Sequence, residues 1–344
     1  MKLKGKAQPI KGLAILPLVL AMGSAGLSAE TKSDYPRYIS FVSENDNYVP
    51  PRDDRHYTSG FRLSYGFQKG RRSTWRDWLG ALSNLARDTD AQEYDFSIGQ
   101  NIYTPTVFTI PQAILNDRPY AAWLYGELSV RTVLRQSEEV IALNLGVVGP
   151  AALGEEAQKF IHSISGDPEP RGWSNQLDNE PALLIHYRRS WFKPLYQSQS
   201  YGIDLVPRFA FNLGNVVTEI GVGSSIRAGS HLPQRDIPAR MQPGLATSSP
   251  RFEARKGRMD WLLFGGLLGR AVGHNIFLDG NTWQDSLSVD KKKLAWDANL
   301  GLMLTFGQFS RPFAISFTHV WRSKEFEVQR DIDKYGSIQI SVQF

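Results

Sequence analysis

The chain has 344 residues, a formal net charge of +5 at pH 7 and no cysteine. The absence of cysteine excludes a disulfide scaffold, a thiol nucleophile and a thiolate metal site. Four of the positive charges are lysines near the N-terminus, and the rest of the chain carries only +1. The charge therefore gives no reason to expect binding to nucleic acid.

Residues 1–29 have the layout of a secretory signal peptide. Lysines at positions 2–11 precede an apolar stretch at 13–22, and small residues follow up to Ala29. The apolar stretch is too short for a spanning helix, and no later segment approaches the ~18 apolar residues that such a helix needs. Without a spanning helix, a membrane-embedded chain must be a closed barrel. We therefore predict a signal peptide at 1–29 and one barrel domain at 30–344.

Side chains that alternate between apolar and polar predict about twelve strands. The alternation is clearest near residues 61–67 and 300–306, and it continues through the last eight residues to the terminal Phe344. In an outer-membrane barrel such a closing strand turns one face to lipid and the other to the lumen. A terminal aromatic residue also resembles the signal that delivers Gram-negative barrels to their assembly machinery. The expected strands are 37–46, 56–68, 92–103, 121–134, 138–150, 181–192, 201–213, 218–229, 259–272, 293–306, 311–322 and 337–344.

The expected fold is thus all-β, a single transmembrane antiparallel β-barrel of about 12 strands with short helices in the connections. With the N-terminus in the periplasm, the connections at 46–56, 103–120 and 150–180 emerge outside the cell. The segments 135–137, 193–200 and 307–310 are expected as short periplasmic turns. Two longer periplasmic connections lie near 69–91 and 230–258, and the first has the apolar spacing of an amphipathic helix.

The connection after Pro150 is unlike an ordinary barrel loop. Residues 154–164 are expected to form a helix, with Glu155 and Glu156 in the first turn, where the helix dipole favours acids. Gln158 and His162 are four positions apart and therefore share a face of this helix. The following residues, 165–181, are dense in proline, glycine and amide side chains.

Seven short pieces of the first half of the chain, taken in order, resemble the outer-membrane lipid A 3′-O-deacylase family. They are SEND at 43–46, HYTSG at 56–60, QNIYTP at 100–105, DRPYA at 117–121, GVVGP at 146–150, the Gln158 and His162 pair, and Trp173 with Gln176 and Asn179. The second half of the chain resembles the family only as a barrel.

The resemblance implies a twelve-stranded barrel in the outer membrane of a Gram-negative cell. Members of the family hydrolyse the 3′-linked acyl (acyloxyacyl) chain of lipid A, within lipopolysaccharide, in a calcium-dependent way. The resemblance implies that His162 is the catalytic base, and that Gln158, Asn45, Asp46 and Thr58 surround the site. All five residues fall at the extracellular rim by the order of the strands.

The chemistry of these residue types agrees with ester hydrolysis. An imidazole titrates near neutral pH, so His162 can activate a water molecule, with Gln158 or a nearby acid fixing its tautomer. Calcium takes hard oxygen ligands, which Asn45 and Asp46 can supply, with Asp167 or Glu169 as further candidates. A bound cation would act as a Lewis acid on the ester carbonyl.

Several alternatives stay open at the level of sequence. His162 could simply form hydrogen bonds at the rim, Thr58 could be structural, and Asn45 with Asp46 could form a strand-end turn. Residues 103–120 contain no lysine, so either Arg118 or the metal would stabilise the oxyanion. Arg52, Arg55 and Arg171 could bind lipid A phosphates or could be ordinary loop charges. His186 and His319 are expected in strands, facing the lumen, and have no assigned role.

Three functions remain for the experiments to separate. The first is the lipid A deacylase. The second is a non-enzymatic barrel, either a porin or a structural protein. The third is a serine-type outer-membrane phospholipase, for which Ser163 and Ser165 are the candidate nucleophiles.

Overall fold

The computed structural model describes residues 36–50, 55–68, 91–235, 240–241, 243–245 and 251–344. The expected signal peptide at 1–29 and the expected amphipathic helix between residues 69 and 90 lie outside these ranges. Among the described residues, no helix is long and apolar enough to cross a membrane.

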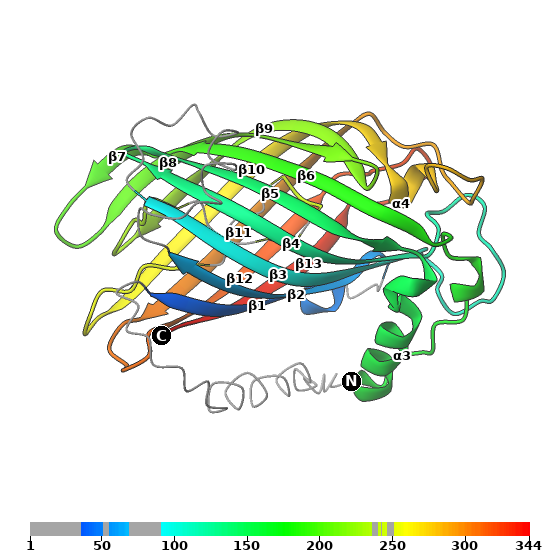
Figure 1. Cartoon of the computed structure of the whole chain (residues 1–344), viewed down its shortest axis with the longest axis horizontal. Helices are drawn as coiled ribbons and strands as arrows, with labels where there is room; N and C mark the ends of the chain where they lie inside the picture. The colour runs from blue at the N-terminus through cyan, green and yellow to red at the C-terminus, as the bar shows by residue number, and fades with distance from the viewer. Residues whose placement is uncertain (1–35, 51–54, 69–90, 236–239, 242, 246–250) are drawn as a thin grey trace, which may run out of the picture.

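Thirteen antiparallel strands form one sheet, and twelve of them close into a barrel (Figure 1). The ring closes because β6 pairs with β8 as well as with β5. The expected barrel of about twelve strands is therefore confirmed. The strands are β1 (Arg37–Asn45), β2 (His56–Gln68), β3 (Ala91–Thr104), β4 (Ala121–Leu134), β5 (Ser137–Val148), β6 (Glu180–Trp191), β7 (Lys193–Gln197), β8 (Gly202–Gly214), β9 (Val217–Gly229), β10 (Met259–Asn275), β11 (Leu294–Phe306), β12 (Phe313–Arg322) and β13 (Asp333–Gln343).

The extra strand, β7, lies in a segment that the sequence predicts to be a short turn. It pairs only with β8, and all five of its residues are exposed. Because the segment is short and has no buried face, it shows no alternation that could have revealed a strand. The last strand, β13, also begins earlier than expected, at Asp333 rather than at Ser337.

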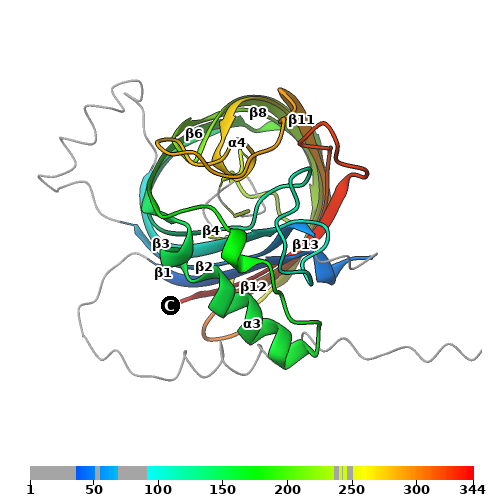
Figure 2. The same ribbon diagram turned by 90° about the vertical axis from the view of Figure 1, so that its right-hand side faces the viewer.

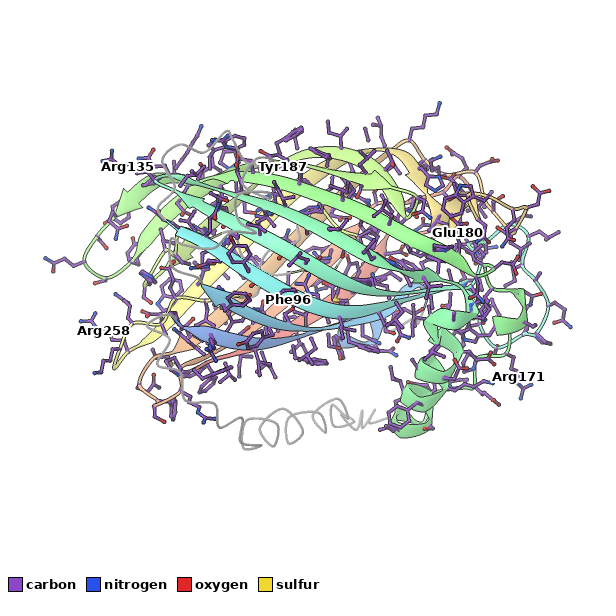
Figure 3. All side chains as sticks on the ribbon, in the orientation of Figure 1. Phe96, Arg135, Arg171, Glu180, Tyr187 and Arg258 are labelled. Atoms are coloured by element: carbon purple, nitrogen blue, oxygen red, sulfur yellow. The ribbon has the colours of Figure 1, made fainter. Side chains whose placement is uncertain are left out.

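The two faces of the barrel differ as they should in a transmembrane barrel. Along β6, Leu183 and Ile185 are exposed on the outside, whereas His186 and Arg188 are fully buried in the lumen. Figure 3 shows side chains such as Phe96 projecting from the outer surface. His186 lies in the lumen as expected and contacts Asn212 at 2.8 Å.

The expectation for His319 was wrong. It shares the outward face of β12 with Ile315 and Phe317, and its ring stacks on Trp321 at 4.1 Å. A polar aromatic ring is tolerated on the outside near a membrane interface, so polarity alone does not decide the face.

The connections define two ends of the barrel. The end with the segments 46–55, 105–120, 149–179, 276–293 and 323–332 is called the loop end, and the opposite end, with the C-terminus, is called the turn end (Figure 1). The loop end carries the helices α3 (Gly154–Ser165) and α4 (Ile276–Asp279) and the 3-10 turns η2 (Asp46–Tyr48), η3 (Pro150–Ala152) and η4 (Trp173–Asn175). The helix predicted at 154–164 is thereby confirmed.

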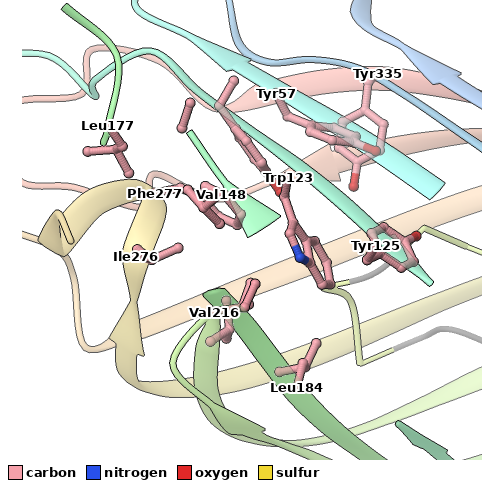
Figure 4. Packing of buried hydrophobic residues seen from close by; sticks show 14 of the residues in the cluster. Tyr57, Trp123, Tyr125, Val148, Leu177, Leu184, Val216, Ile276, Phe277 and Tyr335 are labelled. Atoms are coloured by element: carbon pink, nitrogen blue, oxygen red, sulfur yellow. The ribbon is translucent and has the colours of Figure 1, made fainter. Parts of the chain in front are cut away.

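Aromatic and aliphatic side chains fill the lumen near the loop end (Figure 4). The short helix α4 places Ile276 and Phe277 in this cluster, and Phe277 stacks on Tyr103 at 4.0 Å. Trp123 and Tyr125 from β4 stack at 4.1 Å in the same cluster. The loop end of the barrel is therefore packed rather than open.

Candidate functional site

Helix α3 lies outside the ring of strands, against the barrel wall at the loop end (Figures 1 and 2). Its buried residues, Gly154, Gln158 and His162, are spaced four apart and form one face. A Cβ atom at Gly154 would approach the Cβ of Ala122 to 2.3 Å and the Trp173 ring to 2.7 Å. Only glycine therefore allows the start of the helix to approach the wall so closely.

Beneath α3, the outward face of the sheet is covered by protein. Ile102 of β3 and Ala122 of β4 pack there with Tyr120, Ala152 and Trp173, and we call these five residues the outer-wall cluster. Trp173 is only 1% exposed. Gln100, two positions before Ile102 on the same strand, donates a hydrogen bond from Nε2 to the Ala152 carbonyl at 2.6 Å. These contacts fix the chain that leads into α3.

His162 is held in one tautomer by a backbone carbonyl. Its Nδ1 lies 2.5 Å from the carbonyl oxygen of Pro168, which can only accept a hydrogen bond, so Nδ1 carries the proton. Nε2 then has a lone pair and can accept a proton. The ring is 5% exposed and meets the edge of Phe108, with centroids 5.5 Å apart.

The return of the chain to His162 depends on Gly166, which ends α3 with a φ of 78°. In this left-handed conformation, which favours glycine, the N–H groups of Gly166 and Asp167 both donate to the His162 carbonyl, at 2.8 and 3.2 Å. The sequence analysis proposed Gln158 or an acid as the partner that fixes the imidazole, but Pro168 makes that bond.

Gln158 has a different partner. Its Oε1 accepts a hydrogen bond from Trp173 Nε1 at 2.8 Å. Because the indole N–H can only donate, this bond sets which end of the amide is oxygen. Nε2 of Gln158 is buried and has no hydrogen-bond partner within the described part of the chain. It is thus a fixed, unused donor on the helix face that also carries His162.

Thr58 lies on the outward side of the wall. Its hydroxyl is 2.6 Å from that of Thr104, and both residues are buried. Thr104 is two positions after Ile102 in β3, so the two side chains share the outward face. The register of β2 shifts between Tyr57 and Ser59, and this bulge leaves Thr58 outside the regular alternation.

Asn45, the last residue of β1, lies at the same level along the barrel wall as Ile102 and Ala122. It pairs with Ser59 of β2, Ser59 pairs with Ile102 of β3, and Ile102 pairs with Ala122 of β4. Neighbouring strands are ~4.8 Å apart, so Asn45 lies about 10 Å from Ile102 along this row. Asn45, Thr58 and helix α3 therefore all lie at the loop end, on or next to the first four strands.

Asn45 and Asp46 provide hard oxygen atoms in a tight turn. Asn45 Oδ1 accepts from the Asn47 N–H at 2.7 Å, and Asp46 Oδ2 accepts from the Arg55 N–H at 2.6 Å. An amide or carboxylate oxygen has two lone pairs, so these bonds leave capacity for a cation. In the part of the chain that the structure describes, no group of three or more His, Cys, Asp or Glu side chains could hold a metal. The donors fit a hard cation such as Ca²⁺ with water or substrate oxygens completing its shell.

The two further candidate ligands have other partners. Asp167 accepts a hydrogen bond from the Ser165 hydroxyl at 2.5 Å, and Glu169 lies 4.0 Å from Lys159. The serine alternative gains no support from these contacts. The Ser163 hydroxyl donates to the Phe160 carbonyl at 2.7 Å, within its own helix, and Ser165 turns to Asp167 rather than to an imidazole.

Arg118 does not serve the site as the sequence analysis suggested. It is 1% exposed, lies 5.0 Å from the ring centre of Tyr103 and pairs with Glu325 at 3.6 Å. Tyr103 belongs to the lumen cluster, so Arg118 is on the inner side of the wall, away from α3. Of the two oxyanion stabilisers that the sequence analysis left open, Arg118 or the metal, Arg118 therefore lies on the opposite side of the wall from α3.

The three arginines that the sequence analysis proposed as ligands of phosphate groups differ in their surroundings. Arg171 is exposed at the loop end (Figure 3), and its N–H donates to the carbonyl of Phe108 at 2.9 Å, beside His162. Arg55 pairs with Asp331 at 3.5 Å. Arg52 lies outside the described residues.

Sequence reasoning missed His56, the first residue of β2. Its ring lies between two acids: Nδ1 is 2.6 Å from Asp333, and Nε2 is 3.5 Å from Asp117. Its φ of 61° is in the left-handed region, which is costly for a residue other than glycine. His56 thereby ties β2 and β13 to the connection that carries Phe108. The motif HYTSG contains His56, but nothing local identifies its distant partners.

A closed antiparallel barrel with an apolar exterior, a polar lumen and long connections at one end defines an outer-membrane barrel protein. Residues 13–344 match the family model described as outer membrane protein LpxR, and the chain belongs to this family.

The comparison with solved structures concerns the fold alone. LpxR from Salmonella typhimurium is 21% identical, with 88% of this chain and 99% of that chain covered and a TM-score of 0.71. At this identity the likeness establishes the fold. The β domain of the Bordetella autotransporter BrkA is 9% identical, covering 90% of this chain and 97% of that one, with a TM-score of 0.45. No curated protein matches the chain.

Proposed function

We propose that this protein is an outer-membrane hydrolase that removes the 3′-linked acyl (acyloxyacyl) chain from lipid A, with the loop end facing the cell exterior. Membership of the LpxR family supports this function. The observation that carries it is the His162 ring, whose Nδ1 is bonded to Pro168 so that the lone pair lies on Nε2, on a helix outside the barrel wall. A membrane lipid can reach this position without entering the lumen.

In the proposed reaction His162 is the general base. Nε2 takes a proton from a water molecule, which attacks the ester carbonyl, and the imidazolium then protonates the leaving alcohol oxygen. The Pro168 carbonyl keeps the ring oriented. This step needs no serine, in keeping with the positions of Ser163 and Ser165.

Gln158 is proposed to stabilise the oxyanion. Trp173 fixes its amide so that the unpartnered Nε2 faces away from the indole, on the helix face shared with His162. A fixed donor of this kind stabilises negative charge as it develops on the carbonyl oxygen. Gln158 takes this role in place of Arg118, which was one of the two alternatives that the sequence analysis left open.

Asn45 and Asp46 are proposed to hold Ca²⁺, which when bound would supply a Lewis acid to the ester carbonyl. Thr58 and Thr104 would line the same stretch of wall with hydroxyl groups. Arg171 is proposed as a ligand of a lipid A phosphate, because it is exposed and its backbone bonds to Phe108, the residue that touches His162.

The non-enzymatic alternative is a porin. The packed aromatic cluster at the loop end speaks against an open channel. Conductance of the purified protein in planar bilayers tests this alternative directly, and stable channels with no lipid A turnover would establish it.

The deciding experiment is mass spectrometry of lipid A from cells that express the wild type, His162→Ala or Asp46→Ala. We expect the wild type to release the 3′-linked chain and both variants to leave lipid A intact, while each still folds as a heat-modifiable barrel. Treatment of the wild type with a calcium chelator should stop release, and added Ca²⁺ should restore it. Full activity in His162→Ala would refute the base, and labelling of the wild type by a serine-reactive probe would favour the phospholipase.

A further inference from the structure

The connection between β9 and β10 starts from the turn end and is described at residues 230–235, 240–241, 243–245 and 251–258. The sequence analysis expected a long periplasmic connection here, but side chains of its described parts bond to residues of the lumen wall. Arg235 forms two bonds of 2.6 Å to Glu93, near the turn end of β3, and Arg251 lies 3.1 Å from the same carboxylate. Ion pairs with Glu93 thus hold both the early part of the connection, at Arg235, and its later part, at Arg251.

Between these anchors the connection reaches almost to the loop end. Arg240 Nε lies 2.7 Å from Glu44 Oε1, and the Met241 N–H donates to the same oxygen at 3.3 Å. Glu44 is seven residues along β1 from its first residue, Arg37, a rise of about 23 Å. We call Arg240 and Met241 the tip.

The tip and Leu245 contact opposite sides of the lumen. Met241 packs on Val42 of β1, whereas Leu245 packs on Ala210 of β8 and Leu268 of β10, on the other side of the ring. Together with the aromatic cluster near the loop end, these contacts place buried apolar side chains at several points inside the barrel.

The tip lies directly behind the proposed active site. Glu44 precedes Asn45, and successive side chains of a strand point to opposite faces, so Glu44 points inward where Asn45 points outward. Glu44 pairs with Gly60 of β2, where an added Cβ would lie 3.4 Å from Met241 and 2.4 Å from the hydroxyl of Tyr57.

Aromatic contacts extend this support to β13. The guanidinium of Arg240 lies 5.1 Å from the ring centre of Tyr335 and also bonds to its hydroxyl. Tyr335 in turn meets the edge of Tyr57 at 4.9 Å, beside Thr58. Arg240 belongs to a connection that starts at the turn end. It therefore supports, from inside the barrel, the strand ends that carry the proposed metal ligands and Thr58.

We propose that the tip is a positioning element, and that Arg240 in particular holds Glu44 so that Asn45, Asp46 and Thr58 keep the geometry needed on the outer wall. The inference rests on the proposed function of that site. Loss of Arg240 leaves a buried carboxylate without its cation, and the end of β1 must then move or admit water. Groups that orient ligands without touching substrate typically contribute 10–100-fold to activity or metal affinity.

The test compares Arg240→Ala with Arg251→Ala. Both arginines belong to the same connection, are about equally buried and pair with a lumen carboxylate, but Arg251 does so at the turn end. We expect Arg240→Ala to lower kcat on lipid A about tenfold with little change in KM, and to raise the Ca²⁺ concentration for half-maximal rate. Arg240→Lys should recover part of the loss, and Arg251→Ala should resemble the wild type. Equal losses in the two alanine variants would overturn the proposal.

A second readout does not depend on lipid A. Hydrogen–deuterium exchange of the purified barrel should become faster in peptides that cover residues 44–48 and 55–60 in Arg240→Ala, but not in Arg251→Ala. Unchanged exchange there would overturn the positioning role. Exchange could become faster in Arg240→Ala while the wild type releases no acyl chain. That result would refute the proposed function but would support the role of Arg240 in holding the strand ends. Should Arg240→Ala not fold, the double variant Glu44→Gln/Arg240→Met, which removes both charges, replaces it.

Discussion

The Nδ1 atom of His162 and the carbonyl oxygen of Pro168 lie 2.5 Å apart, six positions from each other in the chain. The bond orients the ring through a backbone carbonyl, whereas in a serine-protease triad a carboxylate does so. It exists only because the chain reverses at Gly166 directly after α3. The activity should therefore depend on this glycine, although it touches no substrate.

The first prediction concerns Gly166→Ala. A Cβ atom at Gly166 would meet nothing within 4 Å, so the only cost is the left-handed φ of 78°, about 1 kcal/mol. We expect the turn to relax, the Pro168 carbonyl to leave His162, and kcat for acyl release to fall several-fold. Gly257→Ala is the matched control, because Gly257 has a φ of 74° and equally open surroundings at the turn end. Equal kcat values for the two variants would contradict the role of the turn.

The second prediction concerns Trp173→Phe, which keeps an aromatic ring in the outer-wall cluster but removes the N–H that fixes Gln158. The lost bond is worth about 1 kcal/mol, so kcat should fall roughly fivefold as the amide becomes free to rotate. Trp123→Phe serves as the control, because Trp123 is fully buried and its Nε1 has no hydrogen-bond partner among the described residues. The same assay on both variants decides whether the indole N–H matters.

The strands could be predicted because their signal is local. Alternation along residues 300–306 is enough to define β11, whichever strand lies beside it. The same holds for α3, where a spacing of four placed Gln158 and His162 on one face before any fold was known. The site residues named from sequence lie on elements of this kind or at their ends.

The remaining features depend on contacts that no local pattern encodes. The bond to His162 comes from a backbone carbonyl, which every residue has, so no side chain marks Pro168. Arg240 and Glu44 are 196 positions apart. Arg118 could not be assigned to the inner side of the wall, because it lies in an irregular connection where alternation gives no direction.

The third prediction concerns pH and Asp117, in the connection between β3 and β4. Burial alone would raise the pKa of this carboxyl, but hydrogen bonds from His56 and Thr106 outweigh it and lower the pKa from 3.8 to about 2. A folded-state pKa below that of the unfolded chain means that the carboxylate stabilises the fold above about pH 4. That contribution, about 2 kcal/mol, is lost as the pH falls through 2.

Asp117→Asn should therefore be less stable than the wild type at pH 7, and the difference should shrink as the pH is lowered toward 2. Urea unfolding of the detergent-solubilised barrel at a series of pH values measures it. Asp285→Asn, at an exposed position in the β10–β11 connection, should match the wild type throughout. A stability difference for Asp117→Asn that stays constant from pH 7 to pH 2 would contradict the assignment.

The fourth prediction concerns the side of α3 that faces away from the barrel. Phe160 and Ile164 are 66% and 62% exposed there, one turn apart, whereas His162 is buried against the wall. Large apolar side chains in this position next to an apolar barrel surface fit the acyl region of the outer leaflet, into which amphipathic helices insert their apolar face. The helix would then hold the membrane lipid and His162 at the same depth.

The double variant Phe160→Ser/Ile164→Ser should lose most of its activity on lipid A in intact outer membranes but keep wild-type activity on lipid A dissolved in detergent micelles. The reason is that the substitutions remove contact with the bilayer and leave Gln158 and His162 in place. Leu195→Ser, at a 60% exposed residue of β7 at the turn end, is the control and should be fully active on both substrates. Equal loss in membranes and in micelles would mean that these side chains stabilise α3 itself rather than its contact with lipid.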